Sequence, residues 1–269
     1  MRPKHRSRTV KNMRVAIVTG AAQGIGRRTA EVLSEAGYTL LLLDMQSCEA
    51  TLSALRAADS EAEALIGDLT NEALIAQAVS LVTERWGRAD VLVNNAGISF
   101  IAPAEATEAA ALRRVLEVNL VAPFVLSRAF GSMMLAKREG SIVNVASIAG
   151  LVGVSDRAAY NASKHGLIGL TRTLAAEWGG RGVRVNAVCP GWVKTEMDIA
   201  DQAASGAYTD DDITGRVPMA RFARPDDIAR AILFLADPAQ SGFVNGQALA
   251  VDGGWTADGS WQSLRMQKR

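Results

Sequence analysis

RVAIVTGAAQGIG, residues 14–26, begins as an apolar run and passes through three glycines before the chain takes on a helical pattern. The run Arg14–Thr19 predicts a buried strand, and the apolar spacing from Ile25 onward predicts a helix. A glycine-rich turn between a strand and a helix presents backbone N–H groups and the helix N-terminus to a pyrophosphate. The competing interpretation is a plain tight turn, and the glycine spacing differs from the GxGxxG form. The flanking strand and helix favour a dinucleotide-binding unit.

The next predicted strand, Tyr38–Asp44, ends in an acidic residue. An acid about 20 residues past the glycines is placed to bind the adenosine ribose 2′-hydroxyl, and it would repel a 2′-phosphate. A helix cap is the competing role for Asp44. On the ribose interpretation, we expect NAD rather than NADP as the cofactor.

Further apolar runs and amphipathic segments alternate along the rest of the chain. This alternation indicates an α/β protein: a Rossmann-type doubly wound sheet of about seven parallel strands with helices on both faces, in a single domain. Ligands bind such sheets at the carboxyl ends of the strands. The other strands are expected at 63–68, 90–94, 141–145, 184–189 and 248–251, and the other helices at 71–86, 108–137, 158–178 and 225–236.

The catalytic domain is expected to span residues 14–254. Residues 1–13 carry five Lys or Arg and no acid, which predicts a basic N-terminal extension that is disordered or precedes the true start. Residues 192–222 show no clean period and are interpreted as a mobile substrate lid. Residues 255–269 are expected to form a polar C-terminal tail.

Tyr160 and Lys164 stand four residues apart on the predicted helix 158–178, so they share one face. A phenol is a poor base at neutral pH, but an ammonium one turn away favours the phenolate and lowers the phenol pKa. Ser147 follows a predicted strand and is placed to hydrogen-bond the same substrate oxygen. The Tyr-x-x-x-Lys spacing also occurs by chance on solvated helix faces. With the nucleotide motifs beside it, it predicts a general acid/base site.

The composition excludes several classes of protein. The 29 basic and 28 acidic residues nearly cancel, which gives no general attraction to nucleic acid or lipid, and no apolar run reaches the length of about 18 residues that spans a membrane. Cys48 and Cys189 stand far apart, and the chain has two histidines, His5 and His165. Neither a disulfide framework nor a metal site is therefore indicated. The expected location is the reducing cytoplasm.

Three further residues carry interpretations of their own. His165 lies about 100° around the helix from Lys164 and is interpreted as a packing residue. Cys189, on a predicted buried strand, is interpreted as a small hydrophobe. Trp192 follows Pro190-Gly191 and either lines the substrate pocket or braces the lid.

In this order, the motifs resemble the classical short-chain dehydrogenase/reductase family over nearly the whole chain, from Arg14 to about Gly254. The basic N-terminal extension and the C-terminal tail depart from the family pattern. The resemblance implies a homotetramer built on the long helices that carry Asn119 and Tyr160. It rests on Thr19-Gly20-xxx-Gly24-x-Gly26, Asn94-Asn95-Ala96-Gly97, Asn119, Ser147, Tyr160-xxx-Lys164 and Pro190-Gly191 with Thr195.

The resemblance also implies a role for each motif residue. Tyr160 would be the acid/base, and Lys164 would depress its pKa and bind the nicotinamide ribose. Ser147 would orient the substrate oxygen, and Asn119 would hold a water that links Lys164 to solvent. The implied cofactor-binding residues are Gly20, Gln23, Gly24, Ile25, Gly26, Asp44, Asp68, Leu69, Asn95, Ala96, Gly97, Tyr160, Lys164, Pro190, Gly191, Val193 and Thr195.

The predicted function is that of an NAD(H)-dependent oxidoreductase that interconverts a secondary alcohol and its ketone by hydride transfer. The acid expected at the ribose and the lid residues Asp198, Asp201 and Tyr208 favour a polyol or sugar alcohol as substrate. The alternative enzyme is a 3-oxoacyl-thioester reductase. Such an enzyme would need a basic surface patch to bind its acidic carrier protein, and it would normally use NADPH as its cofactor. A non-catalytic nucleotide-sensing protein on the same fold is the alternative outside the enzymes.

Overall fold

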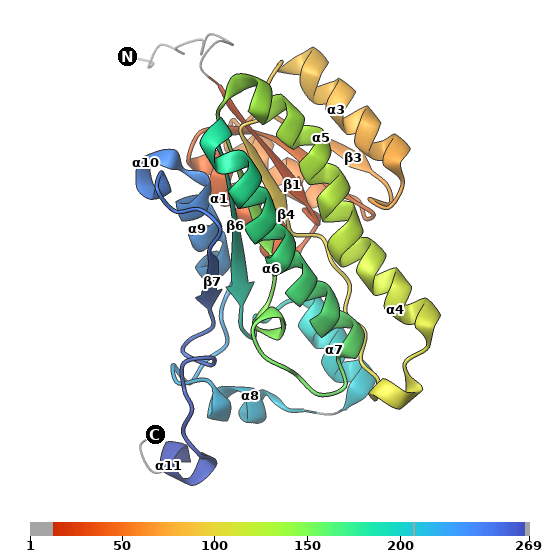
Figure 1. The fold of residues 1–269 in the computed structure, drawn as a ribbon, viewed down its shortest axis with the longest axis vertical. Coiled ribbons are helices and arrows are strands. Elements are labelled where there is room, and N and C mark those ends of the chain that lie inside the picture. Colours follow the sequence, from red (N-terminus) through yellow and green to blue (C-terminus); the bar gives the residue numbers. More distant parts are fainter. Residues whose placement is uncertain (1–12, 207, 267–269) are drawn as a thin grey trace.

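The computed structural model describes residues 13–206 and 208–266, so residues 1–12 of the predicted extension and 267–269 of the predicted tail lie outside it. In the described part, seven strands form one parallel sheet in the order β3-β2-β1-β4-β5-β6-β7, which confirms the predicted doubly wound architecture (Figure 1). The strands are β1 (Arg14–Thr19), β2 (Tyr38–Asp44), β3 (Ala62–Ile66), β4 (Val91–Asn94), β5 (Gly140–Val145), β6 (Val183–Pro190) and β7 (Ala248–Val251).

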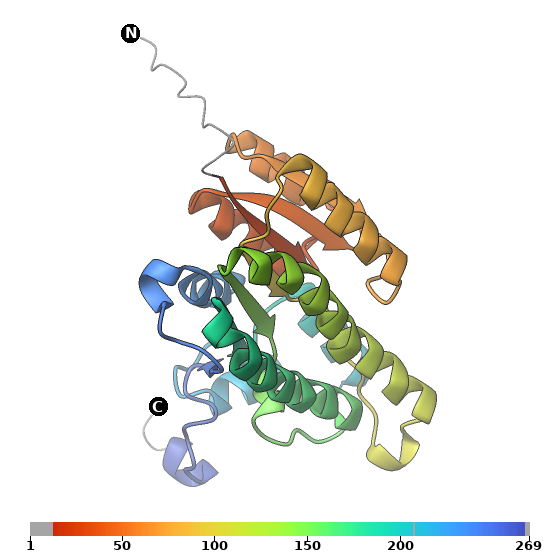
Figure 2. The same cartoon turned by 45° about the horizontal axis from the view of Figure 1, so that its top comes forward.

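The helices cover both faces of this sheet, as Figures 1 and 2 show. They are α1 (Gly24–Glu35), α2 (Glu49–Ala57), α3 (Glu72–Arg85), α4 (Ala109–Leu116), α5 (Ala122–Lys137), α6 (Ala158–Trp178), α7 (Glu196–Ser205), α8 (Asp210–Arg216), α9 (Pro225–Ala236), α10 (Pro238–Ser241) and α11 (Gln262–Met266).

Alternate residues of each strand enter two separate cores, because successive strand side chains point to opposite faces of a sheet. Val15 and Ile17 of β1 pack with residues of α3, α5 and α6 on one face. Ala16 and Val18 pack with residues of α1, α2 and α9 on the other. Because helices bury both faces of the sheet, most strands are continuous apolar runs in the sequence, and they could be predicted from these runs.

The predicted helix 108–137 is interrupted by a π-helical turn, η3 (Glu117–Val121), between α4 and α5. Pro123 provides the reason, because it has no N–H to donate to the carbonyl of Asn119 four residues earlier, and its ring crowds that carbonyl. The stretch Ala109–Lys137 also has the length and hydropathy of a membrane span, which the sequence analysis did not expect. Half of its most apolar window is buried in the protein, as in a core helix.

The expectation that residues 192–222 form no regular element is wrong, because this segment contains α7 and α8. Threonines start both helices: Thr195 Oγ1 accepts a hydrogen bond from Asp198 N, and Thr209 forms a capping box with Asp212. At ten and seven residues, the two helices are too short to show a clean apolar period. The C-terminal tail likewise carries an unpredicted element, α11, and α2 was also missed.

Candidate active site

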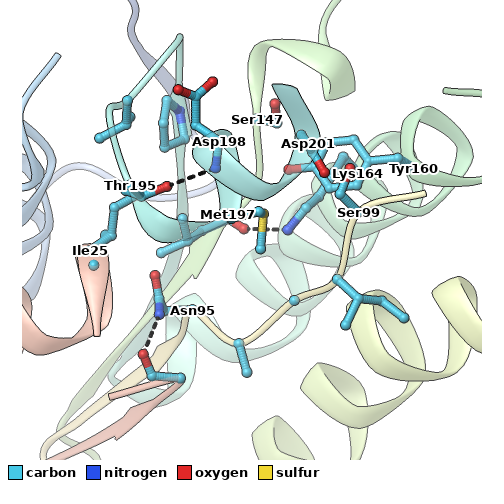
Figure 3. Close-up of a pocket in the computed structure, with 18 of the residues that line it drawn as sticks. Ile25, Asn95, Ser99, Ser147, Tyr160, Lys164, Thr195, Met197, Asp198 and Asp201 are labelled. Atoms are coloured by element: carbon cyan, nitrogen blue, oxygen red, sulfur yellow. Dashed lines mark hydrogen bonds between the residues drawn. The ribbon is translucent and has the colours of Figure 1, made fainter. Parts of the chain in front are cut away.

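A cavity of about 350 Å³ opens at the carboxyl ends of β1, β2, β4, β5 and β6, where this fold places its ligands. In Figure 3, side chains from the glycine turn, from α6 and from α7 surround this space. Every catalytic or cofactor residue predicted from the sequence lines it except Gly26 and Asn119. These two are buried and pack against lining residues, Gly26 against Gly20 and Asn119 against Ile98.

The glycine turn between β1 and α1 has the form of a cradle for a pyrophosphate. Gly20 and Gly24 have positive φ angles of 65° and 55°, which favour glycine, and a Cβ on Gly26 would stand 1.9 Å from the Gly20 carbonyl oxygen. The N-cap residue of α1 is Gln23, and its side chain makes no capping hydrogen bond to the N–H groups of the first turn. Unfilled space and uncapped donors fit a bound dinucleotide.

Asp44 lies at the end of β2 and faces the same cavity. Its Oδ2 accepts a hydrogen bond from Ala22 N and its Oδ1 from Gln46 N, both at 2.9 Å. The competing role of helix cap does not hold, because Cys48 is the N-cap residue of α2. Asp44 instead ties the glycine turn to β2, and each oxygen keeps acceptor capacity for a further hydrogen bond.

Asp68 and Leu69 line the cavity beyond β3, which ends at Ile66 rather than at Asp68 as predicted. Hydrogen bonds from the backbone N–H and the hydroxyl of Thr70 hold the pKa of the Asp68 carboxyl below its usual value. Arg114 of α4 pairs with the same carboxylate at 2.9 Å. Asp68 is thus fixed in its ionised form at the cavity rim.

Thr19 and Asn95 join the ends of β1 and β4. Thr19 Oγ1 accepts hydrogen bonds from the N–H groups of Asn95 and Ala96, each at 2.9 Å. The Asn95 amide donates to the carbonyls of Thr19 and Gly20 at 3.0 and 3.1 Å. These bonds tie together the backbone on both sides of the space into which the glycine turn opens.

Asn119 lies in the π-helical turn and is fully buried. Its Oδ1 accepts from Ile98 N at 2.9 Å, and its Nδ2 donates to Ile98 O at 3.0 Å and to Ser163 Oγ at 3.1 Å. The side chain therefore anchors the loop segment that follows β4. A Cβ on Gly97 would lie 3.2 Å from Asn119 Oδ1 and 3.5 Å from Lys164 Nζ, so glycine leaves the space between these two groups open.

Lys164 is almost completely buried and reaches the cavity from α6. Its Nζ donates to the carbonyl of Val145 at 2.9 Å, which is the hydrogen bond drawn in Figure 3, and lies 5.5 Å from the centroid of the Tyr160 ring. Burial lowers the pKa of Lys164 to about 8. At neutral pH the ammonium form still dominates.

Tyr160 differs from the sequence-based expectation, which was a pKa lowered by Lys164. Burial raises the pKa of this phenol above its ordinary value, while Ser147 and Arg157 act to lower it and Asp201 acts to raise it. The expectation of a lowered Tyr160 pKa is therefore wrong for the protein without cofactor. Removing the phenolate from water raises the pKa by more than the neighbouring positive charge and hydrogen bond lower it. Ser147 is held in place by Ala149 N, which donates to its Oγ at 3.1 Å.

Trp192 has both of the roles considered for it. It lines the cavity, and its ring contacts the rings of Tyr208 and Trp255 in tilted arrangements, with centroids 4.9 and 6.0 Å apart. The prediction for Cys189 is confirmed, because the residue is fully buried. The prediction for His165 is wrong, since this side chain is exposed and its Nδ1 lies 3.0 Å from the carbonyl of Asn161.

Arg157 is one of the cavity residues that the sequence analysis missed, and it is the lining cation among the described residues that was not predicted. It precedes α6 directly and stands three positions before Tyr160, which was the available signal for a place near the same face. Its Nη1 donates to Ser99 Oγ at 2.9 Å and to Asp201 Oδ2 at 3.0 Å. In the described ranges 13–206 and 208–266, no group of three or more His, Cys, Asp or Glu is arranged to hold a metal ion.

The family model described as enoyl-(acyl carrier protein) reductase matches residues 20–256. Two similar curated proteins are named as dehydrogenases of polyols. D-threitol dehydrogenase of Mycolicibacterium smegmatis is 39% identical over 90% of this chain and 93% of its own length. Galactitol 2-dehydrogenase (L-tagatose-forming) of Cereibacter sphaeroides is 41% identical over 90% and 94%.

A solved structure from Beutenbergia cavernae, assigned as an NAD(P)-dependent gluconate 5-dehydrogenase, holds NADP at low occupancy. It is 43% identical to this chain with a TM-score of 0.84, over 91% of this chain and 97% of the other. Sequence and fold agree over nearly the full length of each relative. The protein is therefore a member of the short-chain dehydrogenase/reductase family, an oxidoreductase of CH–OH groups that uses a nicotinamide dinucleotide.

Proposed function

We propose that this protein is an NAD(H)-dependent dehydrogenase that interconverts a secondary alcohol and its ketone, with Tyr160 as the acid/base. The observation that carries the proposal is the meeting of Tyr160, Ser147 and Lys164 in the cavity that also contains the glycine cradle. Ser147 lies in the loop that follows β5, and Tyr160 and Lys164 lie on α6, so the end of the sheet and one helix hold them in place.

The residues divide the reaction between them. When bound, the nicotinamide supplies the hydride acceptor for oxidation and the hydride donor for reduction. Tyr160 takes the hydroxyl proton of the alcohol on oxidation and returns it on reduction. The Ser147 hydroxyl donates a hydrogen bond to the substrate oxygen, and the Lys164 ammonium, 5.5 Å from the ring, stabilises the phenolate. Asn119 holds a water in the open space beside Gly97, which connects Lys164 to solvent.

For the cofactor we propose NAD, because Asp44 stands where the adenosine ribose binds in this fold. The cations among the described lining residues are Arg157 and Lys164, and both belong to the substrate side. No described lining cation is therefore placed to offset a 2′-phosphate beside Asp44.

For the substrate we propose a polyol or sugar alcohol. Asp198, Asp201 and Tyr208 of the lid line the cavity and offer acceptors and a donor to a hydroxyl-rich chain. Dehydrogenases for threitol and galactitol are among the relatives. A 3-oxoacyl-thioester reductase is less well supported, because a carrier with acidic surface would meet the acidic residues of α7 rather than a basic patch.

The substrate proposal is tested with a panel of alditols, cyclic secondary alcohols and their ketones, with NAD or NADH. We expect NADH to form with at least one alditol. Tight NAD binding without turnover on any member of the panel would favour the nucleotide-sensing alternative. Turnover confined to 3-oxoacyl thioesters with NADPH would favour the reductase.

The kcat/KM values for oxidation and for reduction are expected to depend on pH in opposite ways. Because burial raises the pKa of Tyr160, the phenol dominates at neutral pH. Oxidation needs the phenolate as base, so its kcat/KM should rise by about tenfold per pH unit until the phenol has titrated. Reduction needs the phenol as acid, so its kcat/KM should stay level while oxidation rises and should fall only at pH values above the phenol pKa. Initial rates in both directions check this, and parallel profiles would contradict it.

We further propose that the protein is a cytoplasmic homotetramer. Val121 and Phe124, on the helical stretch that carries Asn119, are 38% and 42% exposed, which leaves apolar surface for another subunit. Light scattering at micromolar concentration distinguishes the tetramer from a monomer, and a monomer would contradict the proposal.

A further inference from the structure

An ion pair bridges the lid and the catalytic helix inside the cavity. Arg157, just before α6, pairs with Asp201 of α7, and the two side chains are only 11% and 19% exposed. The same Nη1 atom also donates to Ser99 Oγ, and the guanidinium lies 5.7 Å from the centre of the Trp192 ring. Asp201, Ser99, Tyr160 and Lys164 all line the cavity, and Figure 3 shows them on the same side of it. The pair is thus part of the wall that a substrate contacts.

The charges around this ion pair determine whether a neutral or an anionic substrate can bind beside it. Glu196, Asp198 and Asp201 of α7 all line the cavity, and Lys194 offsets Asp198 at 3.4 Å. Arg157 is the described lining cation on this wall, since Lys164 belongs to the catalytic centre. Asp201 therefore neutralises the one guanidinium that would attract an anionic substrate.

A neutral polyol and a hydroxy acid meet this wall differently. A hydroxyl group can donate to the Asp201 carboxylate and accept from Arg157 without separating the pair. A substrate carboxylate must either replace Asp201 on Arg157 or lie beside the acidic side chains of α7. Both arrangements bring like charges together in a partly buried site, where they are poorly screened.

Resting on the proposed function, we propose that the Arg157–Asp201 pair sets substrate class: it admits neutral polyols and excludes hydroxy acids of the same chain length. The competing explanation is a latch that only holds the lid closed. A latch would affect neutral and anionic substrates equally, whereas a charge filter changes their ratio. The ratio of kcat/KM for the two substrates separates the explanations.

The test compares four- to six-carbon alditols with the matching aldonates in the wild type and in Asp201→Asn. The amide keeps the size of the side chain and frees the charge of Arg157. We expect the wild type to favour alditols by about tenfold or more, and Asp201→Asn to lower that ratio by about tenfold through a gain with aldonates, the scale of one charge-assisted hydrogen bond. Asp211→Asn removes an exposed carboxylate of α8 outside the cavity and should leave the ratio unchanged.

A second variant shows whether Arg157 is the anion contact. Arg157→Gln combined with Asp201→Asn removes both charges, so the aldonate gain of Asp201→Asn should disappear. Thermal unfolding and NAD binding check that each variant is folded. A wild type that prefers aldonates, or an Asp201→Asn ratio equal to that of wild type, would overturn the charge filter while leaving the alcohol dehydrogenase intact. A wild type that oxidises no alditol and no aldonate would overturn both.

Discussion

Replacing Tyr160 with phenylalanine is expected to lower kcat by about 10²–10⁴-fold, which is the usual loss when a general acid/base is removed. The change deletes one oxygen and leaves a ring of the same shape at a partly buried position, so packing is preserved. NAD affinity should change little, because the glycine cradle and Asp44 lie at the other end of the cavity. Steady-state rates with the best alditol, together with NADH fluorescence titration, measure the two effects separately.

Tyr208→Phe is the matched control, because it removes a second phenol from the same cavity. The Tyr208 hydroxyl donates to Asp198 at 3.2 Å and is not placed to exchange a proton with the alcohol. We expect this variant to change KM more than kcat. Lys164→Ala, in contrast, should weaken both turnover and cofactor binding. A Tyr160→Phe enzyme that keeps more than about a hundredth of the wild-type kcat would contradict the acid/base assignment.

The wild type is expected to use NAD with a kcat/KM at least about one to two decades above that with NADP. A 2′-phosphate beside the Asp44 carboxylate would place like charges about 4 Å apart, which costs about 4 kcal/mol at an effective dielectric constant of 20. The nearest arginines do not relieve this repulsion. Arg27 pairs with Glu31 at 3.1 Å, and Arg28 is held by Asp226 of α9 at 2.8 Å, so both guanidinium groups already have carboxylate partners.

Two substitutions separate the charge of Asp44 from its structural role. Asp44 Oδ2 accepts a hydrogen bond from Ala22 N, so Asp44→Ala also loosens the glycine turn. This variant should lower the ratio of kcat/KM with NAD to that with NADP, chiefly by weakening the binding of NAD. Asp44→Asn keeps an acceptor for the hydrogen bond from Ala22 N and removes the charge. It should therefore lower the same kcat/KM ratio while losing less NAD affinity than Asp44→Ala. Equal wild-type efficiency with NAD and NADP, measured as kcat/KM, would show that Asp44 does not contact the ribose.

The sheet and most of its helices were predictable because their patterns are local. β2 and α6 were predicted with the bounds that the structure gives, and both are apolar or amphipathic over many residues. α7 and α8 were not, because short helices that start from threonine caps carry little periodicity. The π-helical turn at Asn119 was missed too, although Pro123 was a visible sign of an irregular helix.

The cavity residues divide in the same way. Gly20, Asp44 and Lys164 were predictable because each follows from a strand end or from a spacing within one helix. Arg157 was not, because its role depends on Asp201, which lies 44 positions away and reaches it through the fold. The direction of the Tyr160 pKa was mispredicted for a related reason. Spacing reveals a neighbouring charge, but burial, which dominates here, is a property of the packed structure.

The most direct test of the account is transfer of hydrogen from substrate to cofactor. Alditols deuterated at their secondary carbinol carbons are incubated with the protein and NAD, and the reduced cofactor is analysed by mass spectrometry. We expect the wild-type protein to place deuterium on the nicotinamide from at least one alditol, and Tyr160→Phe to form about a hundredth as much deuterated cofactor or less under the same conditions. Tight binding of NAD with no deuterium on the nicotinamide from any alditol would contradict it.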